Sequence, residues 1–479
     1  MSKTTIKLGM GMLLSTLLFT GCVPTMVQRA ENRTVPQGYS NTSNTDTVNT
    51  GMLKWNQFFT DPYLIALIDT ALKNNQELNI TLQEINIAKN EVQARKGEYL
   101  PFVGIGAGAG VDKPSRFTSR GASEFSSVFD EEGTHLPDPL QDYQVGVYAS
   151  WELDIWKKLR NAKKSATYSY LASVEGKNLM VTHLVAEIAN SYFELMALDN
   201  QLQILQTNIG IQQNALQIVK MEKEAAKVTE LAVRRFEAEV LKNQSTQYEL
   251  KQQIIETENR INFLVGRFPQ PILRNSDNFI NLVPDSLSTG VPAQLLDNRP
   301  DIKQADLNLS AAKLDVKVAK ADFYPSLRIT AGFGIQGFNF AKFIKAPESL
   351  LFNIAGDLVA PLVNRNALKA KYYSANAKQS QAVFNYEKTL LGAYISVANQ
   401  VSLISNLQQK YALKQQQVDA LNQSITISTN LFRSARADYM EVLLTQRDAL
   451  ESKMEQMEIK LQQMNAMVHM YQELGGGWR

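Results

Sequence analysis

An internal duplication constrains the fold of this chain more than any other feature of its sequence. Residues 97–101 and the alternating stretch 103–108 recur as 321–325 and 327–332, at an offset of 224 residues. Two halves that share such a pattern fold into similar units, so each structural element is expected twice.

The offset between the halves changes further along the chain. Residues 186–190 match 395–399 at an offset of 209, so 15 residues are lost between the two matched regions. The polar stretch 112–141 is longer than its counterpart 337–348. The length difference therefore belongs to a loop, where insertions are tolerated.

Each half flanks this loop with two segments in which apolar residues alternate with polar or small ones. Strands are expected at about 102–112, 143–154, 326–336 and 349–361. The odd offset of 209 requires the apolar residues to change parity between the second and fourth segments, and they do. The apolar, lipid-facing side is represented by Val103, Ile105, Val145, Val147, Trp151, Leu327, Ile329, Phe333, Phe352 and Ile354.

Such alternation suits strands with one face in lipid and the other in water, and it also suits four strands of a soluble sandwich. Four strands cannot close a transmembrane barrel, for which eight is about the smallest number. An open strand edge is not viable in lipid. If the segments span a membrane, several copies of the chain must contribute to one barrel.

The rest of the sequence is helical by pattern. Apolar residues at three- and four-residue steps form a heptad stripe over 195–219, which recurs over 404–425. Proline is absent from 157–268 and from 362 to the end, so long unbroken helices are expected. The series Met454, Met457, Met464 and Met467 has helical spacing and is interpreted as packing rather than as a soft-metal ligand set.

Composition weighs against nucleic-acid binding and against most enzyme classes. The 49 Lys and Arg balance 47 Asp and Glu, whereas phosphate binding needs a concentrated basic surface. A single cysteine excludes an internal disulfide and a thiolate zinc cluster, and the three histidines lie far apart. Residues 332–337 match GxGxxG, but no helix follows them, so we reject a dinucleotide site. We expect no catalytic residue, metal or cofactor.

The only cysteine lies at the end of a secretion signal. Lys3 and Lys7 precede an apolar run over 8–19, which is too short to span a bilayer, and Thr20-Gly21-Cys22 follows. This arrangement resembles a bacterial lipoprotein signal, which implies removal of residues 1–21 and acylation of Cys22. The alternative is an ordinary signal peptide with a cysteine at this position by chance. Residues 22–54 lack apolar periodicity and are expected to form an extended tether.

Four further stretches carry a family resemblance: WNQFFTDP at 55–62, LP at 100–101, WELDIW at 151–156 and NRPDI at 298–302. They are similar to signature stretches of the outer-membrane efflux factors, the TolC-like channel lipoproteins of tripartite efflux systems. The resemblance covers nearly the whole mature chain in the same order, with a first structural repeat over 55–280 and a second over 281–479.

The resemblance implies a mainly α fold with a β-barrel part. It implies a homotrimer in which four strands per chain form one twelve-stranded barrel in the outer membrane of a Gram-negative bacterium. A long helical barrel would continue into the periplasm, with most of the mass. The implied function is a passive exit channel that works with a periplasmic adaptor protein and an inner-membrane RND-type transporter.

The chain departs from the family pattern at three kinds of site. Gly usually follows the stretch WELDIW, but this chain has Lys157. The helix–turn–helix tips, where the adaptor would dock, usually carry Gly, but this chain has Ala226-Lys227 and Ala435-Arg436. Some relatives carry Asp near the periplasmic constriction where this chain has Asn399, whose repeat partner is Asn190. The asparagines are candidate gate residues; the alternative is that Asn399 is an ordinary polar surface residue.

Two other functions remain open at this point. The same fold could serve as an exit duct for type I protein secretion, although the lipidation signal and the NRPDI stretch favour efflux of small molecules or metals. A lipid-anchored periplasmic coiled coil without a pore would explain the heptads. It would not explain four alternating segments arranged around two loops.

Overall fold

The computed structural model describes residues 23–39, 48–129, 133–282, 288–363, 365–434 and 436–479. These residues divide into two compact units. The first unit contains 23–30, 86–171 and 307–384, and the second contains 31–85, 172–306 and 385–479. Each unit draws on both halves of the duplicated sequence.

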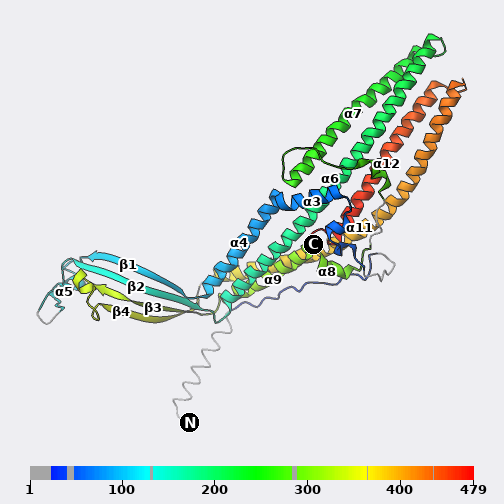
Figure 1. Ribbon diagram of the computed structural model, residues 1–479. Coiled ribbons are helices and arrows are strands. Elements are labelled where there is room, and N and C mark those ends of the chain that lie inside the picture. The colour runs from blue at the N-terminus through cyan, green and yellow to red at the C-terminus, as the bar shows by residue number, and fades with distance from the viewer. Residues whose placement is uncertain (1–22, 40–47, 130–132, 283–287, 364, 435) are drawn as a thin grey trace. The chain divides into compact units, whose positions relative to one another are not determined.

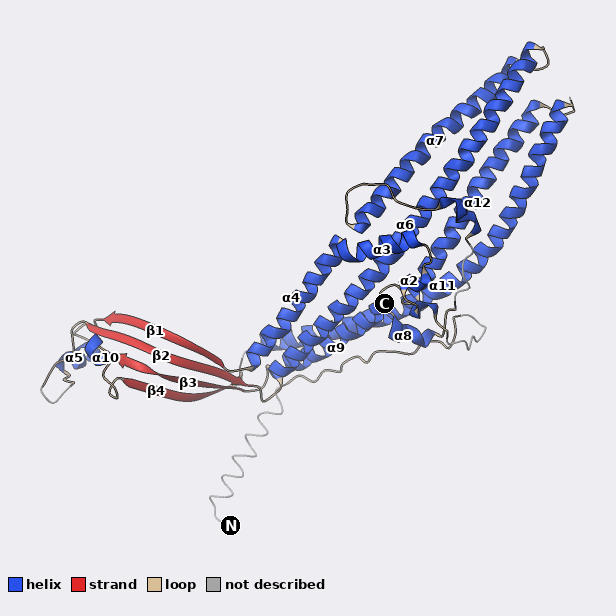
Figure 2. Ribbon diagram, in the orientation of Figure 1, coloured by secondary structure: helices blue, strands red, loops and turns tan. Residues whose placement is uncertain are grey.

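The first unit holds a four-stranded antiparallel sheet. Its strands are β1 (Phe102–Asp112), β2 (Leu140–Leu153), β3 (Ser326–Gly337) and β4 (Leu350–Val359), in the order β1-β2-β3-β4 (Figure 2). Compared with the expected ranges, β2 starts three residues earlier and β4 is shorter at both ends. The two hairpins of the duplicated halves are joined through β2 and β3, which pair over 11 residues.

The loops at one end of the sheet differ as the offset requires. The longer loop, between β1 and β2, carries the helix α5 (Ser119–Ser126), whereas the shorter loop carries only α10 (Phe340–Phe343). The two loops contact each other through the rings of Phe129 and Phe338, which meet edge to face with centroids 4.9 Å apart. The described part of the longer loop therefore packs against the shorter loop.

Long helices dominate the second unit. They are α6 (Lys158–Glu224), α7 (Glu230–Val265), α11 (Asn366–Arg433) and α12 (Tyr439–Glu473), of which α6 and α11 begin in the first unit. Within the second unit, Figure 1 shows the hairpins α6–α7 and α11–α12 side by side. The prediction of long unbroken helices is confirmed, because α6 and α11 run for 67 and 68 residues.

Shorter elements complete the two units. They are η1 (Thr50–Met52), α2 (Trp55–Phe58), α3 (Pro62–Asn74), α4 (Gln76–Tyr99), η2 (Ser276–Asn281), η3 (Pro292–Gln294), α8 (Leu295–Asn298) and α9 (Pro300–Ala321). The helices α4 and α9 are repeat partners, as the offset of 224 requires, and each leads directly into a hairpin of the sheet.

The main apolar core lies where α3 packs among α6, α7 and α12. Tyr192, Ile188 and Leu195 of α6 are fully buried there, together with Leu64 and Ile68 of α3. Of the stretches that carry the family resemblance, WNQFFTDP contributes to this core: Phe59 is buried in it, and Trp55 and Phe58 pack against it. Polar residues of this stretch and of NRPDI make the capping and ion-pair contacts.

Asp61 caps α3 by accepting hydrogen bonds from the backbone N–H groups of Tyr63 (2.8 Å) and Leu64 (3.3 Å), and it also accepts one from the Tyr192 hydroxyl (2.9 Å). Arg299 forms ion pairs with Asp301 (2.8 Å) and with Glu473 near the C-terminal end of α12. The NRPDI stretch thereby ties the start of the second half to the last helix.

One helix among the described residues, α11, is long and apolar enough to cross a membrane by length and composition alone. Only 22% of its most apolar window is buried within the chain. A single helix of this kind is weak evidence for a span. The observation does establish that α11 carries an apolar surface that its own chain leaves uncovered, including Phe384, Leu391 and Ile395.

Candidate functional site

The sheet has one apolar face and one polar face. Cross-strand partners in an antiparallel sheet point to the same side, so the register decides which residues share a face. The pairs Ile105↔Val147, Val147↔Phe333 and Phe333↔Phe352 join all four strands on one side. All ten residues expected on the apolar side lie on this face, including those of β4, where the parity changes from odd to even.

Most of this apolar face is exposed in the isolated chain. Phe352 and Ile354 are 82% and 78% exposed, and Phe333 is 60% exposed. Trp151, Leu327 and Ile329, nearer the helices, are partly buried. Exposure of large side chains over four adjacent strands is unusual for a surface in water and indicates that lipid or protein covers it.

The opposite face carries glycine and polar residues, and a hollow of about 530 Å³ lies over it. Its members include Gly106, Gln144, Ser150, Thr330 and Asn353. The Tyr148 ring lies flat against Gly104, where a Cβ atom would come within 2.6 Å of the ring carbon Cζ. Glycine at this position therefore leaves room for the tyrosine.

The outer edges of the sheet are open. β1 pairs only with β2, and β4 pairs only with β3, among the residues that the structure describes. Each edge offers unpaired backbone N–H and C=O groups along ten or eleven residues. These groups require partners from outside the chain if the sheet lies in lipid.

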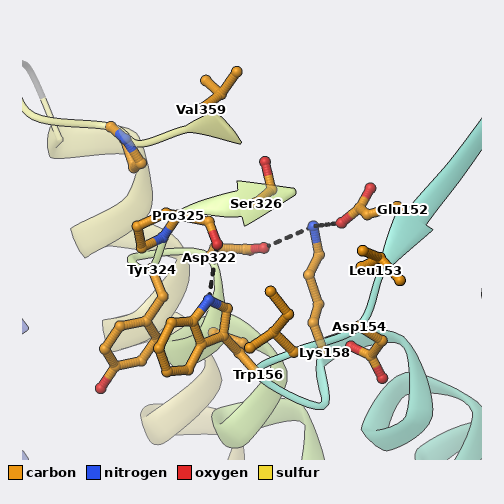
Figure 3. A pocket seen from close by; sticks show the side chains of 13 residues that line it. Glu152, Leu153, Asp154, Trp156, Lys158, Asp322, Tyr324, Pro325, Ser326 and Val359 are labelled. Atoms are coloured by element: carbon orange, nitrogen blue, oxygen red, sulfur yellow. Dashed lines mark hydrogen bonds and ion pairs between the residues drawn. The ribbon is translucent and has the colours of Figure 1, made fainter. Parts of the chain in front are cut away.

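A polar junction connects the sheet to the helices (Figure 3). Lys158, at the start of α6, forms ion pairs with Asp322 (3.1 Å) and Glu152 (3.9 Å). Trp156 stacks on Tyr324 with ring centroids 4.7 Å apart, and its Nε1 donates to the carbonyl oxygen of Pro325 at 2.8 Å. These groups line a hollow of about 190 Å³ between the ends of β2 and α9.

Asp154 fixes the start of α6 at this junction. Its carboxylate accepts hydrogen bonds from the backbone N–H groups of Leu159 and Arg160, both at 2.9 Å, and from the Arg160 guanidinium at 3.0 Å. Burial alone would raise the pKa of Asp154, but these hydrogen bonds outweigh it and hold the pKa below its ordinary value. The carboxylate therefore remains charged and capping at neutral pH.

At the far end of α6, the turn to α7 contains Ala226 in the left-handed region, with φ 57°. This is the conformation that glycine adopts at little cost and alanine does not. Lys227 follows in the same turn and is exposed. In the α11–α12 turn, Ala435 lies outside the described residues, and Arg436 is exposed, with its N–H donating to the Leu431 carbonyl at 2.9 Å.

A small apolar cluster holds the tips of the two hairpins together. It joins Val219 of α6, Val233 and Phe236 of α7 and Leu443 of α12. The charged pairs Lys223–Glu230 and Arg234–Glu230 (2.9 Å) flank the first turn on the surface. The turns thus rest on a packed base.

The structure places the two candidate gate asparagines in different surroundings. Asn399 is exposed on α11, 34 residues before the helix ends at Arg433, or about 50 Å along the helix axis. Asn190 is partly buried on α6, with its Nδ2 atom 3.4 Å from Nε2 of His469 on α12. A gate at Asn399 would therefore lie midway along α11, well away from the tip.

Residues 23–39 follow a defined course that the sequence did not reveal; we call them the strap. In the first unit, Val23 and Met26 pack on an apolar cluster of Val316, Ala319, Phe323 and Tyr372, from α9 to α11. The carbonyl of Arg29 accepts a hydrogen bond from Gln379 of α11 at 2.8 Å.

The strap is also held within the second unit. Arg33 pairs with Asp306 of α9, and the ring of Tyr39 stacks on Tyr394 of α11 with centroids 5.6 Å apart. Its anchor residues are single arginines and tyrosines without period, so no sequence pattern marks them.

Cys22, immediately before the strap, lies outside the described residues. Within the described part of the chain, no group of three or more His, Cys, Asp or Glu side chains could hold a metal ion.

The described chain thus combines a four-stranded sheet that has one apolar face and two open edges with two long helical hairpins. The model of the family described as "Outer membrane efflux protein" matches residues 67–267 and 291–476. The chain belongs to this family and is an outer-membrane efflux protein.

The chain is similar to known proteins over most of their length. The pyoverdine export outer membrane protein OpmQ of Pseudomonas putida is 28% identical over 426 residues, covering 89% of this chain and 88% of OpmQ. The probable outer membrane lipoprotein SilC of Salmonella typhimurium is 24% identical over 93% of both chains. The solved structure of the outer-membrane channel OprN superposes with a TM-score of 0.84 at 21% identity, covering 95% of this chain and 99% of OprN.

We predict that Ala226→Gly stabilises the α6–α7 turn, because glycine removes the cost of a left-handed alanine, on the order of 1 kcal/mol. Amide hydrogen exchange in the last turn of α6 should slow by about fivefold, since 1.4 kcal/mol corresponds to tenfold. Ala225→Gly is the matched control: its φ is not positive, so the same change should accelerate exchange. Equal effects of the two substitutions would contradict the account of this turn.

Proposed function

We propose that three copies of this chain form one outer-membrane exit duct. Each copy contributes its four strands to a closed twelve-stranded barrel, and its helices to a tunnel in the periplasm. The observation that carries the proposal is the sheet itself, which has an apolar outer face, a polar inner face and two unpaired edges.

Closure follows from the cost of unpaired backbone groups in lipid, which is several kcal/mol for each group. When β1 of one copy pairs with β4 of the next, every edge finds a partner. Two copies would give eight strands, whose interior side chains nearly fill, whereas three give a wider lumen. Three copies is also what the family resemblance implies.

Apolar residues on the helices support assembly from several copies. Leu241, Tyr248 and Ile255 lie at seven-residue steps along α7 and are 59%, 70% and 51% exposed. Such a stripe is typical of a helix that packs against another helix. Neighbouring copies would cover these residues and the exposed apolar surface of α11.

The N-terminus is proposed to carry a covalent lipid on Cys22, the only attached group that the channel requires. SilC, which is named a probable outer membrane lipoprotein, supports this assignment. The strap begins one residue after Cys22 and packs on the membrane-proximal parts of α9 and α11. The anchor would therefore sit beside the barrel.

The exposed turns at Lys227 and Arg436 are proposed to dock a periplasmic adaptor protein, which joins the duct to an inner-membrane RND-type transporter. Transport energy would come from that transporter, and the duct would contain no catalytic residue. Asn399 stays a candidate gate residue at mid-height of α11. OpmQ is named for pyoverdine export, which supports a small-molecule cargo.

We predict that the purified full-length protein is a trimer by native mass spectrometry and produces stepwise conductance in a planar lipid bilayer. Several chains are required because one four-stranded sheet cannot enclose a lumen, and three give a wider lumen than two. The control is the same preparation after heat denaturation, which should give neither signal. Single chains that insert without conductance would contradict the proposed duct.

A second prediction separates the two faces of the sheet. Val147→Arg places a charge on the apolar face at the middle of β2, at a cost of about 2–4 kcal/mol if that face meets lipid. The yield of folded, heat-modifiable oligomer on unheated gels should fall at least tenfold.

Gln144→Arg is the matched control, because Gln144 lies three residues away on the polar face and pairs with Gln336. This variant should assemble nearly as well as the unmodified chain. If the two variants assemble equally, the apolar face does not contact lipid.

A further inference from the structure

The helix ends that meet the sheet are strongly basic, although the whole chain has a net charge of only +2. The segments 92–99, 158–165, 314–321 and 366–373 are the eight residues of α4, α6, α9 and α11 nearest the strands. Together they contain ten Lys and Arg and two acidic residues, Glu98 and Asp315; four of the basic residues pair with carboxylates in or just outside these segments, namely Arg95, Lys158, Arg160 and Lys371. The rest of the chain is correspondingly acidic.

Four of these basic residues form two repeat-matched pairs, which we call the basic collar: Lys96 with Lys320, and Arg160 with Lys369. Their offsets of 224 and 209 are those of the duplication. The collar takes one residue from each of the four helix ends that meet the sheet, α4, α6, α9 and α11.

The collar lies at the level where the apolar face ends. Lys96 and Lys320 each precede the first residue of β1 or β3 by six positions, and Arg160 follows the last residue of β2 by seven. Trp156 stacks on Tyr324 in the same zone (Figure 3). Aromatic residues of this type are enriched at membrane–water interfaces, so in the proposed duct the collar would lie at headgroup level on the periplasmic side.

The strap identifies which side of the helices the collar occupies. Lys320 lies one helical turn after Val316, and Lys369 lies one turn before Tyr372; both apolar residues belong to the cluster that holds Val23 and Met26. These two lysines therefore border the strap, which leads to Cys22, the proposed site of lipid attachment.

The first repeat carries the same arrangement without a strap. Arg160 lies over the ring of Tyr99 at 5.7 Å, and Tyr99 is the repeat partner of Phe323. The Lys96, Lys320 and Lys369 side chains are exposed, and no ion pair within 4.0 Å joins any of the three to another described residue. Three cations per chain are therefore available to an external anion.

We propose that the basic collar binds the anionic headgroups of phospholipids in the periplasmic leaflet of the outer membrane. Phosphate groups at this level would lie within a Debye length of the collar, where clustered lysines select anionic lipid. Binding would fix the depth of the barrel and the level of the strap. The inference rests on the proposed function, because it requires the sheet to span the membrane.

The test uses the full-length protein in vesicles of phosphatidylethanolamine with one-fifth phosphatidylglycerol. Either lipid is supplied in dibrominated form, which quenches the fluorescence of nearby Trp151 and Trp156. The ratio of quenching by brominated phosphatidylglycerol to quenching by brominated phosphatidylethanolamine, each corrected for its share of the lipid, reports the local preference for phosphatidylglycerol. We expect a preference of about threefold that falls towards one in 0.5 M NaCl.

The variant Lys96→Gln, Lys320→Gln, Lys369→Gln should abolish this preference. Arg160 is left unchanged because it also holds Asp154. The control variant Lys73→Gln, Lys388→Gln, Lys410→Gln removes three exposed lysines of the second unit and should retain the preference. The salt response of the unmodified protein tests the proposal even if the collar variant misfolds.

Several outcomes would overturn the proposal. A preference that is absent, insensitive to salt or unchanged in the collar variant would show that the lysines do not select anionic lipid. If the collar variant keeps its lipid preference but no longer sediments with purified peptidoglycan sacculi, the collar binds peptidoglycan and not lipid. If neither brominated lipid quenches the tryptophans, the protein has not inserted into the membrane, and the proposed function is contradicted as well. If both lipids quench equally, only the proposal for the basic collar is contradicted.

Discussion

The rest of the structure depends on one requirement, that every backbone hydrogen-bonding group within lipid has a partner. Four strands satisfy this requirement internally for β2 and β3 and leave one edge each of β1 and β4 open. If the apolar face lies in hydrocarbon, as proposed, water cannot serve as the partner for these edges. Such a chain would then be complete only when other copies of it close the sheet.

The duplication explains how a single chain supplies such a sheet. Each half contributes a short helix, a hairpin and a long helical hairpin, in the same order. The junction residues then couple strand to helix at fixed positions. Lys158 bridges Glu152 and Asp322, so the end of β2 in one half is held to the end of α9 in the other. The basic helix ends beside this junction extend the same design to the lipid headgroups.

The periodic parts of this fold could be predicted from the sequence, and the aperiodic parts could not. Alternation and the two offsets together predicted four strands and the face that Val147 and Phe352 share on either side of Phe333. The strap has no period, and its contacts, such as Arg33 with Asp306, join residues more than 250 positions apart. The different surroundings of Asn190 and Asn399 depend on His469, which only a three-dimensional structure places beside one of them.

The most direct test of closure by several copies is a cysteine cross-link between the open edges. In a Cys22→Ser background, Gly108→Cys on β1 is combined in turn with Asn353→Cys, Ala355→Cys or Asp357→Cys on the same face of β4. The account predicts that at least one combination gives covalent trimers on denaturing, non-reducing gels, and that each single-cysteine variant gives at most dimers. Only monomers from all three combinations, with folded protein in the membrane, would contradict it.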